Sequence, residues 1–301
     1  TPLTSFLKHG RNYLTGEIIG RGFTFLSIPI FTRLLTTDQF GLVAVYLAIV
    51  KIFSNIMGLG IRGAVTRYYF EKTNDFQQFL STNTFFFLLF NLILISIIYL
   101  CSSYIAFFFN INESILYTAT FSAFFNATFF IYKAYLIADK QSKKFASLNV
   151  IKTILIITIS VIWILLLDSK QHMGRIYSQL LVLSGFAIFA IYKIQKSAEF
   201  IFIFKHIKYS LVFGLPILMH LMANFILNRF DQIIINQLNG PAETGIYSFA
   251  YRIGFILSLV ILALQKSWRP HFYENKEQDN QRVINQITSK FTGIVLLTAT
   301  I

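Results

Sequence analysis

About nine apolar stretches follow one another along this chain, and most approach the roughly 20 residues that cross a bilayer as a helix. Hydrophobic residues make up 55% of the sequence and charged residues only 13%, against about 25% in a typical soluble domain. Segments this long must pair their own backbone groups in lipid, and the short alternating segments of a membrane barrel are absent. The sequence therefore predicts an all-α, polytopic helical membrane protein. The expected spans are residues 14–35, 40–61, 79–100, 115–137, 147–167, 176–194, 209–236, 243–265 and 287 onward.

Basic residues are distributed unevenly among the connections between these spans. The net charge is +13, and most of the 26 Lys and Arg residues fall in alternate connections. The remaining connections hold only Arg33, Lys170, Arg175 and Arg229. Cytoplasmic loops carry an excess of Lys and Arg, so this pattern predicts a multi-pass protein with its N-terminus in the cytoplasm. It also accounts for the net charge without a nucleic-acid partner.

The sequence offers little for metal, cofactor or enzyme chemistry. Its single cysteine, Cys101, excludes an intrachain disulfide and a cysteine-based metal site. It contains no glycine-rich nucleotide loop and no metal-site or nucleophile–base pattern. We therefore expect no metal, no other cofactor and no enzymatic activity, so that any active transport would draw on a proton or sodium gradient.

A weak internal repeat divides the chain. Residues 38–50 (DQFGLVAVYLAIV) resemble residues 242–254 (AETGIYSFAYRIG), with Gly41 and Gly245 at matching positions. Such repeats are typical of transporters, so we expect two pseudo-symmetric helical lobes around a central cavity. The expected organisation is a lobe of six helices at residues 1–194, a basic cytoplasmic linker at 195–208, and a second lobe at 209–301. Only two helices and part of a third fit into the second lobe, which we expect to be truncated.

Two stretches of the sequence resemble a known family. The first is RLLTTDQFGL at residues 33–42, and the second runs from Gly214 to Gly254 and includes Asp231 and the motif from Tyr247 to Ile253. They are similar to the polysaccharide repeat-unit flippases of the multidrug/oligosaccharidyl-lipid/polysaccharide exporter superfamily. The resemblance implies alternating access of a central cavity to the two sides of a bacterial cytoplasmic (inner) membrane. It implies a polyprenyl-diphosphate oligosaccharide as cargo, for O-antigen, capsule or exopolysaccharide synthesis, and contact with membrane lipids and the polysaccharide polymerase machinery.

Ionisable residues within the spans are the first candidates for a binding site, because charge is expensive in lipid and its presence points to function. Lys51 and Arg252 lie at similar depths in corresponding spans of the two lobes, where they would suit a diphosphate; alternatively each snorkels or pairs within its own lobe. Glu17 and Arg21 share a helical face. They form a structural ion pair, or Glu17 couples transport to an ion gradient while Arg21 serves as a cation of the cavity. For Lys152, we expect snorkelling toward the cytoplasm.

Three residues of the seventh span are further candidates. Asp231 could couple or gate transport, although an acid is equally expected at a helix end. His220 and Asn224 lie four residues apart and could contact sugar or relay protons, but packing is the simpler interpretation. Pro216 permits a bend in this span.

Two other functions compete with the flippase interpretation. One is a multidrug exporter of small organic cations within the same superfamily, which positively charged cavity residues disfavour. The other is an integral membrane enzyme that processes lipid-linked sugars. The outward connections of about ten residues or fewer leave little room for its active site.

Overall fold

All regular secondary structure that the computed structural model describes is helical. The described residues are 15–16, 18–71, 75–195 and 202–254, together with 285, 289 and 292–293. Contacts divide the chain into two units, Thr1–Ile246 and Tyr247–Ile301. The second unit contributes helical residues 247–254 to the described part.

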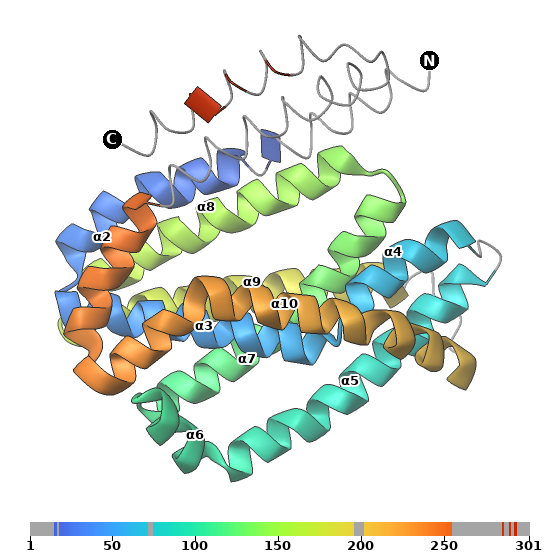
Figure 1. Ribbon diagram of the computed structural model, residues 1–301, viewed down its shortest axis with the longest axis horizontal. Helices are drawn as coiled ribbons and strands as arrows, with labels where there is room; N and C mark the ends of the chain where they lie inside the picture. Colours follow the sequence, from blue (N-terminus) through green and yellow to red (C-terminus); the bar gives the residue numbers. More distant parts are fainter. Residues whose placement is uncertain are drawn as a thin grey trace. The chain divides into compact units, whose positions relative to one another are not determined.

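The first unit begins its described part with helical residues 18–26, which a turn at Ser27 separates from the next helix (Figure 1). The helices that follow are α2 (Ile28–Leu34), α3 (Thr37–Gly58), α4 (Ile61–Glu71), α5 (Phe76–Leu100), α6 (Ser102–Phe109), α7 (Glu113–Ala138), α8 (Ser142–Leu166), α9 (His172–Gln195) and α10 (Phe204–Asn239).

Six of the described helices are long and apolar enough to cross a membrane, namely α3, α5, α7, α8, α9 and α10. Each overlaps one of the expected spans and begins two to five residues before it. The prediction of a polytopic helical protein is therefore confirmed. Helix α10 begins at Phe204, inside the linker expected at 195–208. About half of the eighth expected span and most of the ninth lie outside the described residues.

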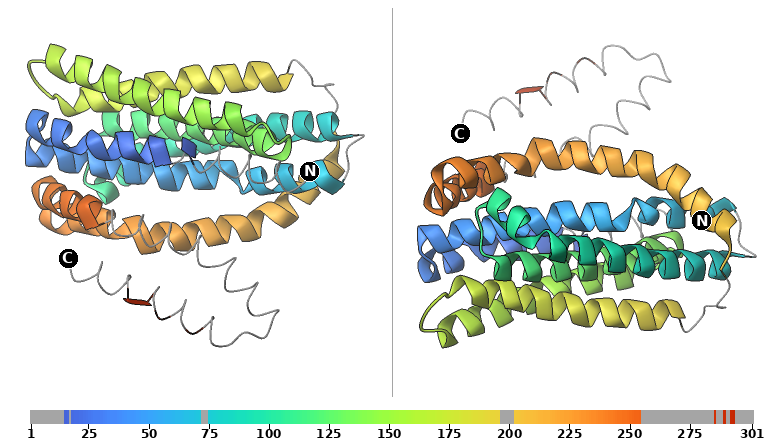
Figure 2. Two further views of the ribbon diagram at one scale, coloured as in Figure 1. Left: turned by 90° about the horizontal axis from the view of Figure 1, so that it is seen from above. Right: turned by 90° about the horizontal axis from the view of Figure 1, so that it is seen from below.

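Helices α3 and α7 form the centre of the first unit. Helix α9 packs on α7, α8 packs on α9, and α10 packs on α3 and α4, as the two views of Figure 2 make clear. The fully buried Tyr46 joins three of these helices, because its hydroxyl lies 2.7 Å from the Ser122 hydroxyl of α7 and 3.4 Å from the Ile176 carbonyl of α9. This residue fixes α3 against both neighbours.

Helix α3 starts at a complete capping box and stops at a left-handed turn. Thr36 accepts a hydrogen bond from the Gln39 backbone N–H, and the Gln39 side chain accepts one from Thr36. At the other end Leu59 and Gly60 both have positive φ, which interrupts the helix before α4. A Cβ at Gly60 would collide with the Gly214 backbone of α10, so this turn requires glycine for its conformation and for close packing.

Helix α6 is tied to the far end of α10 by a pair of asparagines. The Asn110 side chain, which follows α6, donates to the Asn236 carbonyl at 2.9 Å. The Asn236 side chain donates in return to the carbonyls of Phe109 and Asn110, at 2.7 and 3.1 Å. These bonds satisfy carbonyls at the end of α6 that its own hydrogen-bonding pattern leaves open.

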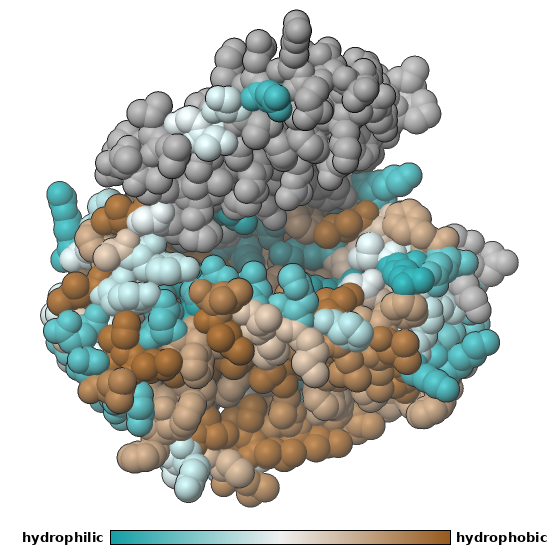
Figure 3. Space-filling model, viewed as in Figure 1, coloured by the Kyte–Doolittle hydropathy of each residue, from teal (hydrophilic) through white to brown (hydrophobic). Residues whose placement is uncertain are grey.

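The surface fits a helical bundle in lipid. Figure 3 shows apolar side chains gathered over the lower part of this face, with polar ones at its left and right edges and in a band across its middle. Large hydrophobic residues are exposed along α5 and α8, among them Leu92, Ile93, Ile162, Leu165 and Leu166. A water-soluble protein rarely exposes so continuous an apolar surface, whereas lipid accommodates it.

Candidate substrate cavity

A cavity of about 280 Å³ lies within the first unit, between helical residues 18–26 and helices α3, α7, α8 and α9. Three cations line it: Lys51 from α3, Lys152 from α8 and Arg175 from α9. No carboxylate lies among its lining residues in the part of the chain that the structure describes. The cavity is therefore built to receive negative charge.

The three cations reach the cavity from different depths. Lys51 and Lys152 lie near the middle of their helices and are close enough for the charge of Lys51 to act on Lys152. Arg175 lies near the start of α9, where its guanidinium is 3.4 Å from the Ser160 hydroxyl of α8. Ser160 is eight residues beyond Lys152, or about 12 Å along a helix. The positive charge thus extends over a length that several anionic oxygens could share.

Neutral polar groups complete the lining. Thr24, Ser27, Asn126, Thr153 and Gln179 all face this cavity, and Ser27 and Gln179 are largely buried. Hydroxyls and amides in these positions can bond phosphate or sugar oxygens that the cations leave unpaired. The remaining lining is apolar, which strengthens the electrostatic effect of each cation.

Phe130 of α7 links the cavity to further cations. Its ring centroid is 5.9 Å from the Lys51 Nζ, 5.5 Å from the Arg62 guanidinium carbon and 4.8 Å from the Lys133 Nζ. Lys133 also donates a 3.2 Å hydrogen bond to the Asn149 side chain. Aromatic faces attract cations, so Phe130 helps to hold three positive groups together without neutralising them.

The structure groups some of the predicted site residues and leaves others apart. Lys51 lines the cavity, whereas Arg21 is exposed on its helix and Glu17 lies outside the described residues. Arg252 is half-buried in the second unit, whereas Lys51 belongs to the first. The pairing of Lys51 with Arg252 stays a prediction, as does that of Glu17 with Arg21.

The candidates on α10 lie away from the cavity. His220 and Asn224 are exposed and do not line it. Asp231 is half-buried, and its carboxylate accepts a 2.8 Å hydrogen bond from the Gln232 backbone N–H. Roles for these residues in sugar contact, coupling or gating stay predictions.

Sequence reasoning missed two of the three cavity cations. Lys152 was expected to snorkel, and Arg175 was expected in a connection because the apolar stretch begins at residue 176. Helix α9 begins at His172, so Arg175 lies in its first turn. Gln179 one turn later also lines the cavity, and this pair of long polar residues on one face is the signal that could have identified it.

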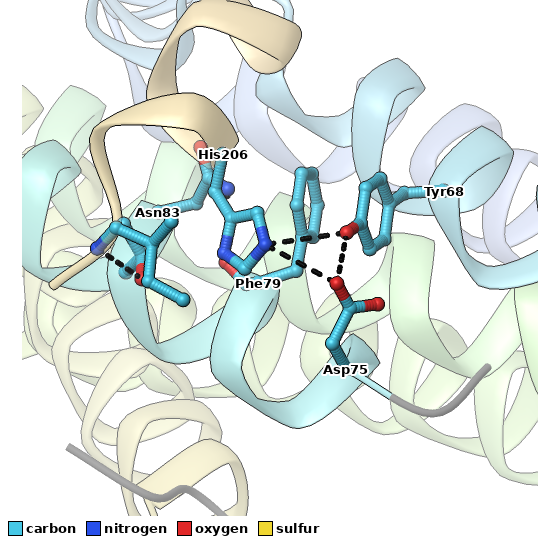
Figure 4. A network of polar contacts seen from close by, with 7 residues as sticks. Tyr68, Asp75, Phe79, Asn83 and His206 are labelled. Atoms are coloured by element: carbon cyan, nitrogen blue, oxygen red, sulfur yellow. Dashed lines mark hydrogen bonds and ion pairs between the residues drawn. The ribbon is translucent and has the colours of Figure 1, made fainter. Parts of the chain in front are cut away.

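A second polar cluster joins α4, α5 and α10 (Figure 4). The Tyr68 hydroxyl donates to the Asp75 carboxylate at 2.7 Å and lies 3.2 Å from the His206 Nε2. The Tyr68 ring stacks on Phe79 with centroids 3.8 Å apart. Partial burial disfavours the charge of Asp75, but hydrogen bonds from Tyr68 and His206 outweigh it and lower the pKa of this carboxyl. The cluster fastens the start of α10 to the α4–α5 corner.

No group of three or more potential metal ligands occurs among the described residues. Neither the cavity nor the α4–α5–α10 cluster therefore has the ligand set of a metal centre.

Comparison with known proteins finds relatives along nearly the whole chain. The sequence profile of the family described as "Polysaccharide biosynthesis protein" matches residues 6–276. Two proteins of Haemophilus influenzae are similar. "Lsg locus putative protein 1" is 27% identical over 286 residues, which cover 91% of this chain and 67% of that protein. An "Uncharacterized membrane protein" is 24% identical over 285 residues, which cover 93% of this chain and 68% of that protein.

Solved structures share the fold. A multidrug resistance MATE family transporter of the MOP superfamily, in an outward-facing conformation, has a TM-score of 0.64 at 15% identity over 99% of this chain and 71% of that one. A MOP superfamily transporter from Pyrococcus furiosus, described as having a binding pocket of reverse polarity, has a TM-score of 0.59 at 16% identity. That match covers 98% of this chain and 69% of the other. At these identities the likeness concerns the fold alone.

Proposed function

Because this chain belongs to the polysaccharide biosynthesis protein family and has the fold of MATE transporters, we propose that it moves a polyprenyl-diphosphate oligosaccharide between the leaflets of a bacterial cytoplasmic membrane. The diphosphate would bind in the cavity, the sugars would follow in the space between the lobes, and the polyprenyl tail would stay in the bilayer. The observation that carries this proposal is the cavity of three cations with no described carboxylate in its lining.

The size of the cavity supports a diphosphate rather than a whole oligosaccharide. At about 280 Å³ it lies just below the roughly 300–1,000 Å³ of typical ligand pockets. Lys51 and Lys152 bind one phosphoryl group of the diphosphate. Arg175 of α9, whose guanidinium lies beside Ser160 further along α8, reaches the oxygens of the other phosphoryl group. Charge-assisted hydrogen bonds of this kind are about twice as strong as neutral ones.

The other predicted residues have proposed roles outside this cavity. Arg252 offers the cargo a cation in the second lobe, and Arg21 with Glu17 couples the movement to a proton or sodium gradient. Asp231 gates the outer end, and His220 and Asn224 contact the sugars.

Export of small organic cations is the competing function, and the MATE fold favours it. Such cargo binds carboxylates and aromatic faces, and the three half-buried cations of the cavity would repel it. Lys51, Lys152 and Arg175 therefore discriminate between the two functions.

The test uses purified full-length protein in lipid vesicles that contain a fluorescent polyprenyl-diphosphate saccharide in one leaflet. Wild-type protein should equalise the two leaflets, and the triple variant Lys51→Gln, Lys152→Gln, Arg175→Gln should slow this at least about 100-fold, because each cation contributes about 1.5–3 kcal/mol. Glutamine keeps most of the side-chain volume. Equal rates for wild type and triple variant would refute the cavity, and uptake of an organic cation by wild type would favour the alternative.

A further inference from the structure

A second, much smaller pocket lies beside the main cavity. It is enclosed by α3, α4, α7 and α10 and has a volume of about 10 Å³, which is room for about one water molecule. Its lining includes Asn55, Gly58, Arg62 and Leu221, with Phe130 on the side of the main cavity. Phe130 lines both spaces, so its side chain lies where they border each other.

A hydrogen bond between two side chains also lies at the border of the two spaces. The Asn126 side chain, which faces the main cavity, donates at 3.1 Å to the Ser54 hydroxyl, which faces the small pocket. Ser54 donates in turn to the Val50 carbonyl at 2.6 Å. One aromatic ring and one side-chain bond thus lie at the border of the two spaces, and both can move without unfolding a helix.

The small pocket contains a donor without an acceptor. Asn55 is only 3% exposed, and its Nδ2 has no hydrogen-bond partner in the part of the chain that the structure describes. A buried amide donor in this state is unfavourable by about 1–3 kcal/mol and calls for an explanation. The guanidinium of Arg62 lines the same space. Both groups are donors, so a ligand here must accept hydrogen bonds.

We propose that Asn55 and Arg62 form a second oxyanion site, through which a phosphoryl group of the cargo passes between the main cavity and the α4 end of the bundle. The proposal rests on the proposed function. In this conformation the pocket admits a water molecule but not a phosphoryl group, so Phe130 or Leu221 must turn aside for the cargo. Lys133, whose Nζ lies 4.8 Å from the Phe130 ring centroid, maintains positive charge along the route.

Glycines make the small pocket testable without removing charge. A Cβ at Gly58 would meet no atom within 4 Å, so a side chain can begin there without colliding with backbone, and a leucine would occupy the small pocket and press on its lining side chains. Gly185 on α9 is equally open but lines an apolar space between α8 and α9, which makes Gly185→Leu the matched control.

The experiment measures two quantities for each variant of the full-length protein in nanodiscs and vesicles. Equilibrium binding of inorganic pyrophosphate reports on the main cavity, and leaflet transfer of the fluorescent lipid diphosphate reports on the route. We expect Gly58→Leu, Asn55→Leu and Arg62→Gln to keep pyrophosphate affinity within about twofold of wild type and to slow transfer at least about tenfold. Gly185→Leu should change neither quantity.

The outcomes separate this inference from the proposed function. If the wild-type protein transfers the lipid and Gly58→Leu and Asn55→Leu transfer it at undiminished rates, the second site is refuted. The proposed role of the main cavity is unaffected by that result. Loss of pyrophosphate binding in those variants also overturns it, because the two spaces would then be one site. A wild-type protein that neither binds pyrophosphate nor transfers the lipid refutes the proposed function itself.

Discussion

Gly41 and Gly245, the matching glycines of the internal repeat, lie against each other backbone to backbone. A Cβ on Gly41 would be 2.9 Å from the Gly245 amide nitrogen and would collide with the Pro241 carbonyl. A Cβ on Gly245 would be 3.2 Å from the Gly41 nitrogen and would collide with the Thr37 carbonyl. Equivalent residues of two repeats meet in this way when a pseudo-two-fold axis passes between them.

Alanine at either glycine should therefore destabilise the protein. Gly41→Ala and Gly245→Ala each place a methyl group against fixed backbone, and overpacking of this kind is unfavourable by about 1–3 kcal/mol. The melting temperature in detergent, followed by circular dichroism, should fall for both. Gly22→Ala is the control, because a Cβ at Gly22 meets nothing within 4 Å. A control that melts as early as the two variants would contradict the packing explanation.

Replacing Asn236 should loosen α6 from α10. Asn236→Leu removes the donor to the Phe109 and Asn110 carbonyls and should lower the free energy of unfolding by about 1–3 kcal/mol. A double-mutant cycle with Asn110→Ala measures the coupling between the two side chains. Additive changes in the free energy of unfolding would mean that the two sets of bonds act independently of each other.

The Asp75 cluster should make stability sensitive to acid. Its hydrogen bonds lower the folded-state pKa of Asp75 below the ordinary value of 3.8, so the stabilisation is present above that value and is lost as the pH falls through the folded pKa. The melting temperature should therefore decline below about pH 4 by less in Asp75→Asn than in wild type. Parallel declines in the two proteins would remove Asp75 as a source of the sensitivity.

The single cysteine can establish the orientation in the membrane. Cys101 is exposed at the end of α5, which the distribution of Lys and Arg predicts to lie on the outer side. A membrane-impermeant maleimide should label it in intact spheroplasts and fail to label it from outside in inverted vesicles. The reverse pattern would invert the topology. Cys101→Ser provides the background signal.

Individual charge removals should weaken anion binding unequally. Lys152→Gln should raise the Kd for pyrophosphate about tenfold or more, because Lys152 lies near mid-helix among apolar lining. Arg175→Gln should have a smaller effect, since the Arg175 guanidinium is already partnered by the Ser160 hydroxyl. Arg175→Lys keeps the positive charge but removes the planar guanidinium, so it separates the effect of charge from that of bidentate hydrogen bonding. Identical affinities in all three variants and wild type would exclude these residues from the site.

The lengths of the apolar segments predicted which parts of the chain form helices, but they placed the first residue of each helix too late. Apolar runs identified the six membrane-spanning helices of the described chain, but polar first turns such as Ser142–Lys144 in α8 were counted as connections. The same criterion hid Arg175, which lies in the first turn of α9.

The grouping of cations could not be read from periodicity. Helices α3, α7 and α8 are apolar on most sides, so no stripe indicates which face meets which neighbour. Lys51 and Lys152 come together through the packing of α7, α8 and α9, which is a property of the tertiary structure. The internal repeat, in contrast, marks Gly41 and Gly245 as matching positions, and the structure places these two residues in contact.

Helix α10 is long and makes its closest backbone contact well away from its middle, as a lever does at its pivot. Its 36 residues extend about 54 Å, well beyond the roughly 30 Å hydrocarbon core of a bilayer. Gly214, pressed against Gly60 two residues before Pro216, divides it into arms of about 15 Å and about 38 Å. A rotation about this fulcrum moves the tip near Asn239 roughly two and a half times as far as the tip near Phe204. A small displacement at the Tyr68–Asp75–His206 cluster would therefore be magnified at the opposite face of the membrane.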